Sequence, residues 1–560
     1  MATMAQETSA QKIADRHVTT MAELNPLIAV ELGLGDPADD RLPDYSPAGY
    51  EAAAAQARRV LAELDAADIP DELGEQRCAT LLRERLTAEL AVHDSGEFLR
   101  TIRNIDSPLH LLQGIFTMLP TDTDDQWRNI GARLGRMPVA VRQYTDSLAA
   151  GRDRGLLAAP RQVTTVIGQL EEWLSGSRPG GWFGELISPA PQALHAELET
   201  GALAAAKAIA EIRDWLRTEY LPAADGTPDA VGEQRYSLLA RYWNGADLDL
   251  REAYAWGWEQ FHELAAQMRQ EAERVRPGAT PSEAMQWLAT EGPAIEGVEE
   301  TRIWLQQLMD RAIADLNGTH FDLAEPLLRV ESRIAPPGTA SAPYYTQPSL
   351  DFSRPGRTWL PAFGRTRFPE WEHVSTWYHE GVPGHHLQLG QWIYLAESLS
   401  KYQVTLGLVS ANVEGWALYA ERLMDELGYL TDPGHRLGYL NVQMLRALRV
   451  VLDIGMHLEL EFPSHSPYRP GEIMTPGPAR EFFGLYCGLP SALLDSEIVR
   501  YLGWPGQAIG YKLGERAWRR GRAAAEAAKG ADFDLKAWHM AALSMGSLGL
   551  DDLERGLAEL

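Results

Sequence analysis

The stretch "STWYHEGVPGHHLQLG", from Ser375 to Gly390, holds three histidines and one glutamate within the eight residues that begin at His379. It starts like the zinc-binding pattern H-E-x-x-H, in which two histidines four residues apart share one face of a helix. His379 and Glu380 supply the first half of that pattern, but Pro383 stands where the second histidine is needed. The first question is whether this segment can still bring two imidazoles to one metal ion.

The pair Pro383-Gly384 offers a way to restore the pattern. Proline removes a backbone donor and glycine permits unusual dihedral angles, so the two together favour a break in a helix. In a straight helix, His379 and His385 would point about 120° apart. A two-residue bulge at Pro383-Gly384 would return His385 to the missing position. We therefore predict His379 and His385 as metal ligands, with His386 as the alternative second histidine.

A third ligand is expected from the next predicted helix, "VSANVEGWALYAERLMDEL", Val409 to Leu427. Glu414 lies far enough downstream for the chain to turn and run back toward the histidines. Glu421 follows seven residues later, on the same helix face and about two turns away. One of the two glutamates could bind the metal while the other orients a ligand histidine. We choose Glu414 as the ligand.

Charge and composition restrict the classes of function. The chain has 560 residues, of which 45% are hydrophobic and 23% charged, as is typical of a globular protein. Its net charge of -27 opposes binding to nucleic-acid phosphates and to anionic membranes. We therefore expect neither a nucleic acid nor a membrane as partner. The sequence gives no prediction of oligomeric state.

Cysteine content and the first residues indicate the compartment. The chain has only two cysteines, Cys78 and Cys487, which does not support a disulfide framework. The beginning, "MATMAQETSAQKIADRH", lacks the apolar core of a signal peptide, and no stretch approaches the length of a membrane span. These features predict a reduced, cytoplasmic protein.

The fold class is predicted from hydrophobic periodicity. Apolar residues recur at helical spacing in the segments 49–68, 199–221 and 251–276. The segment 328–363 is instead rich in Pro, Gly, Tyr and Ser with short β-like runs, which indicates a small sheet just before the histidines. We predict a mainly α fold with a small β-sheet. The expected regions are 1–225, 226–327 and 328–560, packed as one integrated body, and the best linker candidate is the segment 222–234, which is rich in Pro, Gly and Asp.

The motifs resemble those of a known family. "HEGVPGHHLQ" followed by "EGWALYAE" resembles the bacterial "domain of unknown function 885" family, which is grouped with the zincin metallopeptidases. Three further blocks are similar to the family in the same order: Glu23–Pro47, Arg446–His457 and Glu497–Glu515. The resemblance implies a large helical zincin-like fold and zinc-dependent hydrolysis of an amide bond. It also implies His379, His385 and Glu414 as ligands and Glu380 as the general base.

Other side chains are candidates for contact with the reacting group. Amide hydrolysis develops negative charge on the carbonyl oxygen, which a hydrogen-bond donor can stabilise. The donor candidates are His457, Tyr511, Tyr344 and Tyr345, of which His457 could instead pair with Asp453 in a structural contact.

Cationic side chains could bind a substrate carboxylate. Arg500 is the preferred candidate because its guanidinium can make bidentate contacts, and Lys512 is the second. Arg446 and Arg449 could serve too, or could form a solvated helix face. We assign Arg500, Lys512, Tyr344 and Tyr345 to substrate binding.

These observations predict an enzyme with one zinc ion per chain, although a site of two histidines and a carboxylate also suits iron or manganese. The expected substrates are short peptides or amino-acid conjugates. Two alternatives remain: a metal-dependent non-peptidase reaction on a small metabolite, and a non-catalytic binding protein on the same scaffold. The intact Glu380 speaks against the last, because pure binding needs no base beside a ligand.

Overall fold

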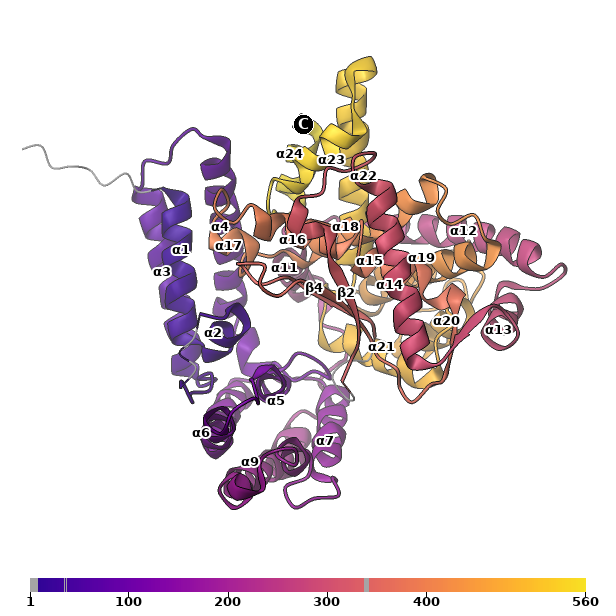
Figure 1. Cartoon of the computed structure of the whole chain (residues 1–560). Coiled ribbons are helices and arrows are strands. Elements are labelled where there is room, and N and C mark those ends of the chain that lie inside the picture. The colour runs from indigo at the N-terminus through magenta and orange to yellow at the C-terminus, as the bar shows by residue number, and fades with distance from the viewer. Residues whose placement is uncertain (1–8, 35, 37, 337–341) are drawn as a thin grey trace, which may run out of the picture. The chain divides into compact units, whose positions relative to one another are not determined.

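The computed structural model describes residues 9–34, 36, 38–336 and 342–560 (Figure 1). Helices predominate and two small sheets accompany them, which confirms the expected mainly α class with a small sheet. The chain divides into two compact units. The first comprises Met1–Ile69, Leu86–Val231 and Ser496–Trp504, and the second comprises Pro70–Arg85, Gly232–Asp495 and Pro505–Leu560. The three regions expected from the sequence stay a prediction.

The first unit is a bundle of helices. They are α1 (Ala10–Leu24), α2 (Pro26–Leu32), α3 (Pro47–Ala66), the second part of α4 (Leu73–Asp94), α5 (Pro108–Met118), α6 (Asp124–Asp153), α7 (Pro160–Leu174), α8 (Trp182–Leu186), α9 (His195–Trp215), α10 (Leu221–Ala223) and the end of α21 (Ser491–Gly503). Two of the segments expected to be helical, 49–68 and 199–221, fall on α3 and on α9 with the turn that follows it.

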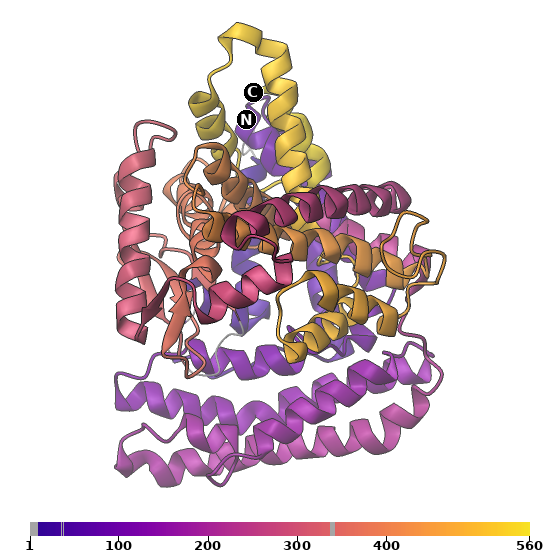
Figure 2. The same ribbon diagram turned by 90° about the vertical axis from the view of Figure 1, so that its right-hand side faces the viewer.

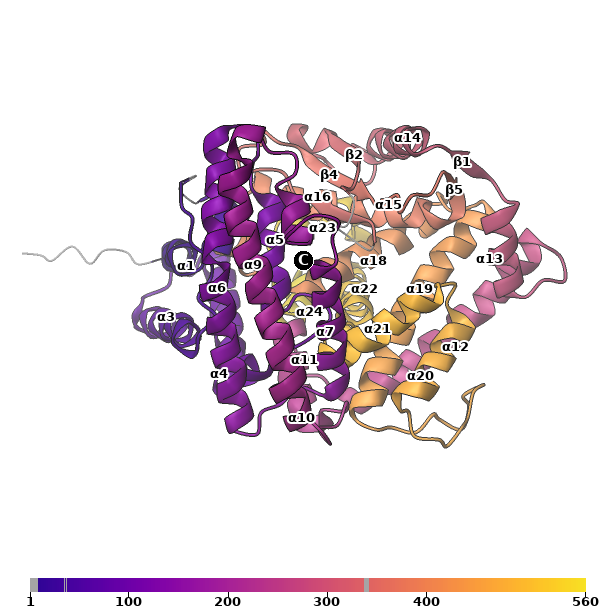
Figure 3. The same ribbon diagram turned by 90° about the horizontal axis from the view of Figure 1, so that it is seen from below.

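The core of the first unit lies between its long helices. α6 and α9 run side by side, as the lower part of Figure 2 and the labels of Figure 3 show. Their facing residues include Leu134 and Tyr144 on α6 and Leu198 and Ile209 on α9, all at most 1% exposed. Burial of such apolar area is the main stabilising term for a bundle of this kind.

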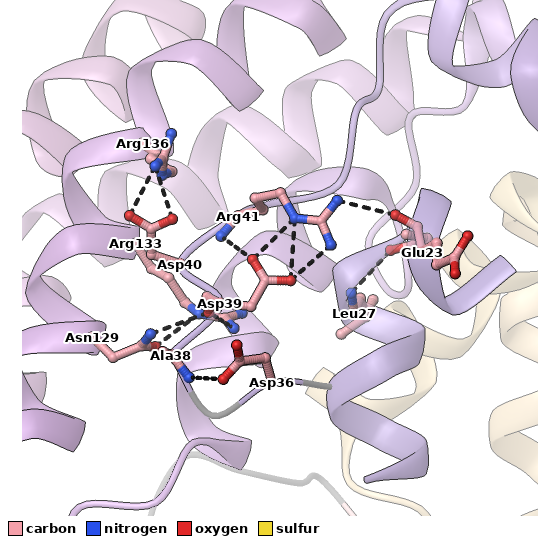
Figure 4. Close-up of polar contacts among 11 residues, drawn as sticks. Glu23, Leu27, Asp36, Ala38, Asp39, Asp40, Arg41, Asn129, Arg133 and Arg136 are labelled. Carbon is pink, nitrogen blue, oxygen red and sulfur yellow. Dashed lines mark hydrogen bonds and ion pairs between the residues drawn. The ribbon is translucent and has the colours of Figure 1, made fainter. Parts of the chain in front are cut away.

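A cluster of charged residues ties the loop after α2 to α6 (Figure 4). Arg41 holds the Asp39 carboxylate with its guanidinium and its backbone N–H. Asn129 and Arg133 of α6 both donate to the backbone carbonyl of Asp39. Arg136, one turn further along α6, pairs with Asp40. These contacts hold residues 39–41 against α6, because the carboxylates of Asp39 and Asp40 and the carbonyl of Asp39 are paired.

The second unit contains the histidine segment. Its helices are the first part of α4, α11 (Gly232–Asn244), α12 (Leu250–Val275), α13 (Pro281–Thr290), α14 (Val298–Leu316), α15 (Val374–Glu380), α16 (His385–Tyr394), α17 (Lys401–Val404), α18 (Ser410–Glu426), α19 (Pro433–His457), α20 (Pro476–Tyr486), the start of α21, α22 (Gly510–Lys529), α23 (Leu535–Leu543) and α24 (Leu550–Glu559). The segment expected to be helical at 251–276 forms α12, which packs along α19 (Figure 3).

Two small sheets lie in the second unit. β2 (Val330–Ile334) pairs in parallel with β4 (Gly356–Leu360), and β3 (Tyr344–Thr346) pairs with the other edge of β4 in the antiparallel sense. A separate antiparallel pair joins β1 (Ala294–Glu296) to β5 (Arg367–Pro369). The three-stranded sheet is the one expected before the histidines, and β4 contacts α16.

Close packing of α18 on α22 positions the glutamate helix. A Cβ atom on Gly415 would lie 2.4 Å from the Cα of Gly514, so neither helix has room for a side chain at this crossing. α18 also packs against α15 and α16. The helix that carries Glu414 is thus fixed between α22 and the two histidine helices.

Candidate metal centre

The histidine segment forms two helices rather than one. α15 ends at Glu380 and α16 begins at His385, with a break at residues 381–384 that includes a cis Val382–Pro383 bond. The N–H of Gly384 donates to the carbonyl of Tyr378, six residues earlier, at 3.0 Å. An α-helix makes this bond to the fourth residue, so the break accommodates two extra residues. The expected bulge inside one helix is therefore wrong in form, although the displacement is of the expected size.

Glycine and a tryptophan stabilise this break. A Cβ atom on Gly384 would lie 2.0 Å from the carbonyl oxygen of His379, so only glycine fits there. The indole N–H of Trp416, from α18, donates to the carbonyls of Pro383 at 2.9 Å and of Gly384 at 3.2 Å. The carbonyl of Pro383 at the break is thereby paired, as buried backbone groups must be, and that of Gly384 also accepts from the N–H of Gln388 in the first turn of α16.

The break brings His379, His385 and Glu414 together. Oε2 of Glu414 lies 3.3 Å from Nε2 of His379 and 3.7 Å from Nε2 of His385. One ligand atom from each of the three residues lies within 4.8 Å of the others. Glu380 is adjacent, with Oε1 4.0 Å from Nε2 of His379. The two histidines come from different helices and the glutamate from a third, so the three side chains converge from different directions.

Glu421 and Ser375 lie behind His379. Oε1 of Glu421 is 2.8 Å from Nδ1 of His379, and the Ser375 hydroxyl donates to Oε2 of the same carboxylate at 2.6 Å. Glu421 is fully buried. With its proton on Nδ1, His379 turns the lone pair of Nε2 toward Glu414. Ser375 was not among the residues singled out in the sequence, although it lies one helical turn before His379.

His386 points away from this cluster. Its Nε2 lies 3.1 Å from the carbonyl of Leu327, and its Nδ1 lies 2.9 Å from the Tyr345 hydroxyl. A carbonyl can only accept, so Nε2 carries the proton and Nδ1 accepts from Tyr345. Both nitrogens of His386 are therefore engaged in hydrogen bonds. In contrast, Nδ1 of His385 is buried and has no hydrogen-bond partner among the described residues.

Burial and mutual charge shift the titration of the cluster. Burial opposes protonation of His379, but the neighbouring carboxylates of Glu414 and Glu421 raise its pKa to about 10. Burial raises the pKa of Glu380 to about 8. Burial and the neighbouring His379 lower the pKa of His385 to about 4. Burial opposes ionisation of Glu414, but the two histidines lower its pKa to about 2. Shifts of this size are characteristic of functional sites.

The residues present fit a divalent metal. When Nε2 of His379 carries no proton, its lone pair and the Glu414 carboxylate face each other as two acceptors, and a cation between them, either a proton or a divalent metal, makes the arrangement favourable. Ligands held 2.0–2.2 Å from a tetrahedral zinc ion lie about 3.3–3.6 Å from one another, close to the 3.3 and 3.7 Å separations in this cluster. Oε2 of Glu414 is buried and lacks a hydrogen-bond partner within the described part of the chain, so an electron pair is available there.

The other predicted contact residues of the second unit lie in different surroundings. His457 is fully buried, with Nε2 3.5 Å from Asp453, and Asp453 in turn accepts from Tyr236 and from the N–H of Gly506. Arg446, on the same helix α19, lies 4.0 Å from Glu421 and so marks the part of α19 nearest the cluster. His457 lies eleven residues further along α19, about 16 Å along the helix axis. This placement favours the structural pairing with Asp453 over contact with a substrate.

Lys512 and Tyr511 are adjacent in sequence but differ in environment. Lys512 is fully buried, and its ammonium group donates to Glu515 and, at 2.6 Å, to Gln443. Lys512 is thus an internal partner of Glu515 and Gln443, and its role in substrate binding stays a prediction. The ring of Tyr511 lies under the guanidinium of Arg449, 4.7 Å from its centroid. The donor role of Tyr511 stays a prediction.

The two tyrosines of β3, Tyr344 and Tyr345, make different contacts. Tyr344 stacks on Trp359 of β4, with ring centroids 5.8 Å apart. Tyr345 donates to His386, and its ring centroid lies 6.5 Å from that of His385. Tyr345 therefore borders the cluster, whereas Tyr344 packs within the sheet.

Arg500 belongs to the first unit, where it pairs with Glu497 at 3.1 Å.

The sequence and the fold identify the family. Residues 26–557 match the family described as "Bacterial protein of unknown function (DUF885)". The chain belongs to this family, which confirms the resemblance seen in its motifs. None of the curated proteins matches the chain.

Two solved structures share the fold. One is the crystal structure of a "putative lipoprotein" from Colwellia psychrerythraea, with a TM-score of 0.85, 22% identity and 98% of each chain covered. The other is a "putative lipoprotein of unknown function" from Shewanella oneidensis, with a TM-score of 0.75, 19% identity, and 98% of this chain and 100% of that chain covered. At this level of identity the likeness establishes the fold alone.

None of the described helices combines the length and apolar character needed to cross a bilayer.

Proposed function

We propose that this protein is a zinc-dependent hydrolase that cleaves an amide bond in short peptides or amino-acid conjugates. The observation that carries the proposal is the convergence of His379, His385 and Glu414, with the carboxyl group of Glu380 4.0 Å from His379. Two histidines and one carboxylate with a further carboxylate beside them are the groups used by metal-dependent peptidases. The zincin-like fold and zinc itself are part of this proposal.

The three ligand residues would hold the metal, and the neighbouring residues perform the proton chemistry. When bound, zinc supplies a Lewis acid that polarises a carbonyl and lowers the pKa of water. Glu380 accepts a proton from the attacking water and returns it to the leaving nitrogen. Glu421 and Ser375 keep the His379 ring in one orientation and one tautomer throughout.

The burial of the cluster supports a small substrate. The side chains of His379, His385 and Glu380 are 4–9% exposed and that of Glu414 is 21% exposed. A folded protein could not bring a backbone amide to groups so enclosed, whereas a short flexible chain could. The cytoplasm remains the predicted location; the two structural relatives carry the name lipoprotein, so location needs its own measurement by cell fractionation.

The experiment that tests this function combines metal analysis with peptide hydrolysis. We expect the zinc-loaded protein to cleave members of a panel of short peptides. The Glu380→Gln variant should keep its zinc and lose at least about 10²-fold in turnover, because the general base is removed and no predicted ligand is changed. Glu397→Gln, at an exposed glutamate of the loop that follows α16, is the matched control and should behave as the wild type.

Two results would contradict the proposal. Unchanged turnover in Glu380→Gln would remove Glu380 from the role of base. A fully zinc-loaded protein that hydrolyses no amide would instead favour a different reaction on a small metabolite, or a binding function.

A further inference from the structure

Arg446 of α19 lies beside the metal centre with most of its hydrogen-bonding capacity unused. Its Nη1 donates to the carbonyl of Val442 at 3.1 Å, one turn earlier on the same helix. Its Nη2 lies 4.0 Å from Oε1 of Glu421, which is too far for a hydrogen bond. Its Nε is buried and has no hydrogen-bond partner among the described residues.

A guanidinium has five N–H donors, and this one uses a single donor within the described structure. Buried charged donors are costly when they are unpaired, so they are normally satisfied by protein, water or a ligand. The ion pair with Glu421 balances the charge of Arg446. It leaves N–H donors along the edge of the planar guanidinium available for a ligand. Such a fork matches the two oxygens of a carboxylate.

Arg446 is partly exposed, as Glu414 is. Its side chain is 12% exposed and that of Glu414 is 21% exposed, whereas His379 and Glu421 are at most 4% exposed. Arg446 also lies near the proposed base. Its guanidinium lies 4.0 Å from Glu421, whose carboxylate is 2.8 Å from His379, the residue that precedes Glu380 in the chain.

Other cations of the same unit close to α19 are committed elsewhere. Arg449 lies over the ring of Tyr511, and the ammonium group of Lys512 is enclosed by Glu515 and Gln443. Arg446 is therefore the cation best placed to receive a negative group of a substrate whose amide lies at the metal centre.

We propose that Arg446 binds a substrate carboxylate one residue beyond the amide that is hydrolysed, so that the protein acts at the carboxyl end of its substrates. This inference rests on the proposed function. Water adds its oxygen to the amide carbonyl carbon, the C–N bond breaks, and the nitrogen leaves with a proton as a free amino acid. Consecutive Cα atoms are about 3.8 Å apart, so a terminal carboxylate lies within a few ångströms of the scissile bond. The guanidinium of Arg446 lies 4.0 Å from the carboxylate of Glu421, which is in turn 2.8 Å from His379, and this short chain of contacts is the basis for placing the carboxylate there.

The test compares each of a panel of N-acyl dipeptides as the free acid and as the carboxyl-terminal amide. We expect the zinc-loaded wild type to prefer the free acid by about 10- to 100-fold in kcat/KM, as suits a charged hydrogen-bonded pair. In Arg446→Gln this preference should disappear through a higher KM for the acid, while the zinc content stays at the wild-type level.

Two further variants complete the design. Arg446→Lys keeps the positive charge beside Glu421 but loses the two parallel N–H donors of the guanidinium, so it should retain only part of the preference for the free acid. It also provides a result if Arg446→Gln fails to fold. Arg436→Gln lies on the same helix, where Arg436 pairs with Asp425 and Glu271, and it should keep the full preference.

The outcomes separate this inference from the proposed function. Equal cleavage of acids and amides by the wild type, or equal weakening of both in Arg446→Gln, would overturn the role of Arg446 and leave the hydrolase intact. Cleavage of neither form would overturn the hydrolase. In that case, binding decides the role of Arg446: N-acetylalanine, but not its amide, should raise the melting temperature of the chelator-treated wild type and not that of Arg446→Gln. No difference between the two probes would overturn the inference.

Discussion

At the scale of the residue, Glu421 fixes the orientation of the His379 ring. Its carboxylate is fully buried, accepts from Ser375 and lies 2.8 Å from Nδ1 of His379. A carboxylate behind a ligand histidine sets the tautomer and makes the opposite nitrogen a better electron donor. The same carboxylate balances Arg446, so this residue connects metal binding to the proposed recognition of substrate.

We predict that Glu421→Gln weakens zinc binding by about 10- to 100-fold without abolishing it, because the predicted ligands remain but His379 loses its charged partner. Competition with a chromophoric chelator measures the change. Glu426→Gln, on the same helix at a side chain 45% exposed, should bind zinc as the wild type does. Identical affinities in both variants would show that Glu421 has no part in orienting the ligand.

Single residues also show what the sequence could and could not predict. The sequence Pro383-Gly384 predicts a break in the helix, because the effect of these two residues on the backbone depends on the residues themselves and not on distant contacts. The choice between His385 and His386 depends on Leu327 and Tyr345, which are distant in sequence and occupy both nitrogens of His386. The sequence did not predict that Lys512 is fully buried while Arg446 is partly exposed, because the burial of each side chain depends on which helices pack over it.

At the scale of the element, the break between α15 and α16 is the feature that builds the centre. Gly384 allows the chain to pass close to the last turn of α15, and the indole N–H of Trp416 from α18 donates to the carbonyls of Pro383 and Gly384. The helix that carries Glu414 is thus attached to the break itself.

We predict that Gly384→Ala lowers the free energy of unfolding by about 1–3 kcal/mol, as overpacking does, and reduces zinc binding. Its added methyl group would overlap the carbonyl of His379, so the break must shift and carry His385 with it. Urea unfolding and metal analysis measure the two effects. Gly477→Ala in α20, where nothing lies within 4 Å of the added atom, should keep zinc and be at least as stable as the wild type. An equally stable, zinc-binding Gly384→Ala would refute this account of the break.

The elements themselves were largely predictable, since α3, α9, α12 and the small sheet follow from periodicity and turn residues. The displacement across residues 381–384 was predictable in size, but its form, a break between two helices, was not. A sequence indicates that a helix is interrupted, but the new start of the next helix is decided by tertiary contacts such as those of Trp416.

At the scale of the whole molecule, buried neutral histidines make stability depend on pH. Burial lowers the pKa of His373 and of His539 to about 3, from 6.5 in the unfolded chain. Between these values the unfolded chain binds protons that the native protein does not. Their contribution to stability is therefore present above pH 6.5 and is lost as the pH falls toward 3.

We predict that each of these histidines contributes a slope of about 1.4 kcal/mol per pH unit to the free energy of unfolding between pH 6.5 and 4.5. Replacing His539 by glutamine should remove one such contribution, and replacing His373 as well should remove a second. Urea unfolding at pH 7 and pH 5 provides the measurement. A slope that is the same in the wild type and in both variants would mean that these histidines titrate normally in the native protein.

The measurement that tests the central claim most directly is the metal content of protein purified without chelators, beside His379→Ala, His385→Ala and His386→Ala. The account predicts about one zinc ion per chain in the wild type and in His386→Ala, and none in the other two variants. Stoichiometric iron would keep the ligands but redirect the proposed chemistry toward oxidation. Loss of metal in His386→Ala with retention in His385→Ala, or a wild type that binds no divalent metal after reconstitution, would contradict the account.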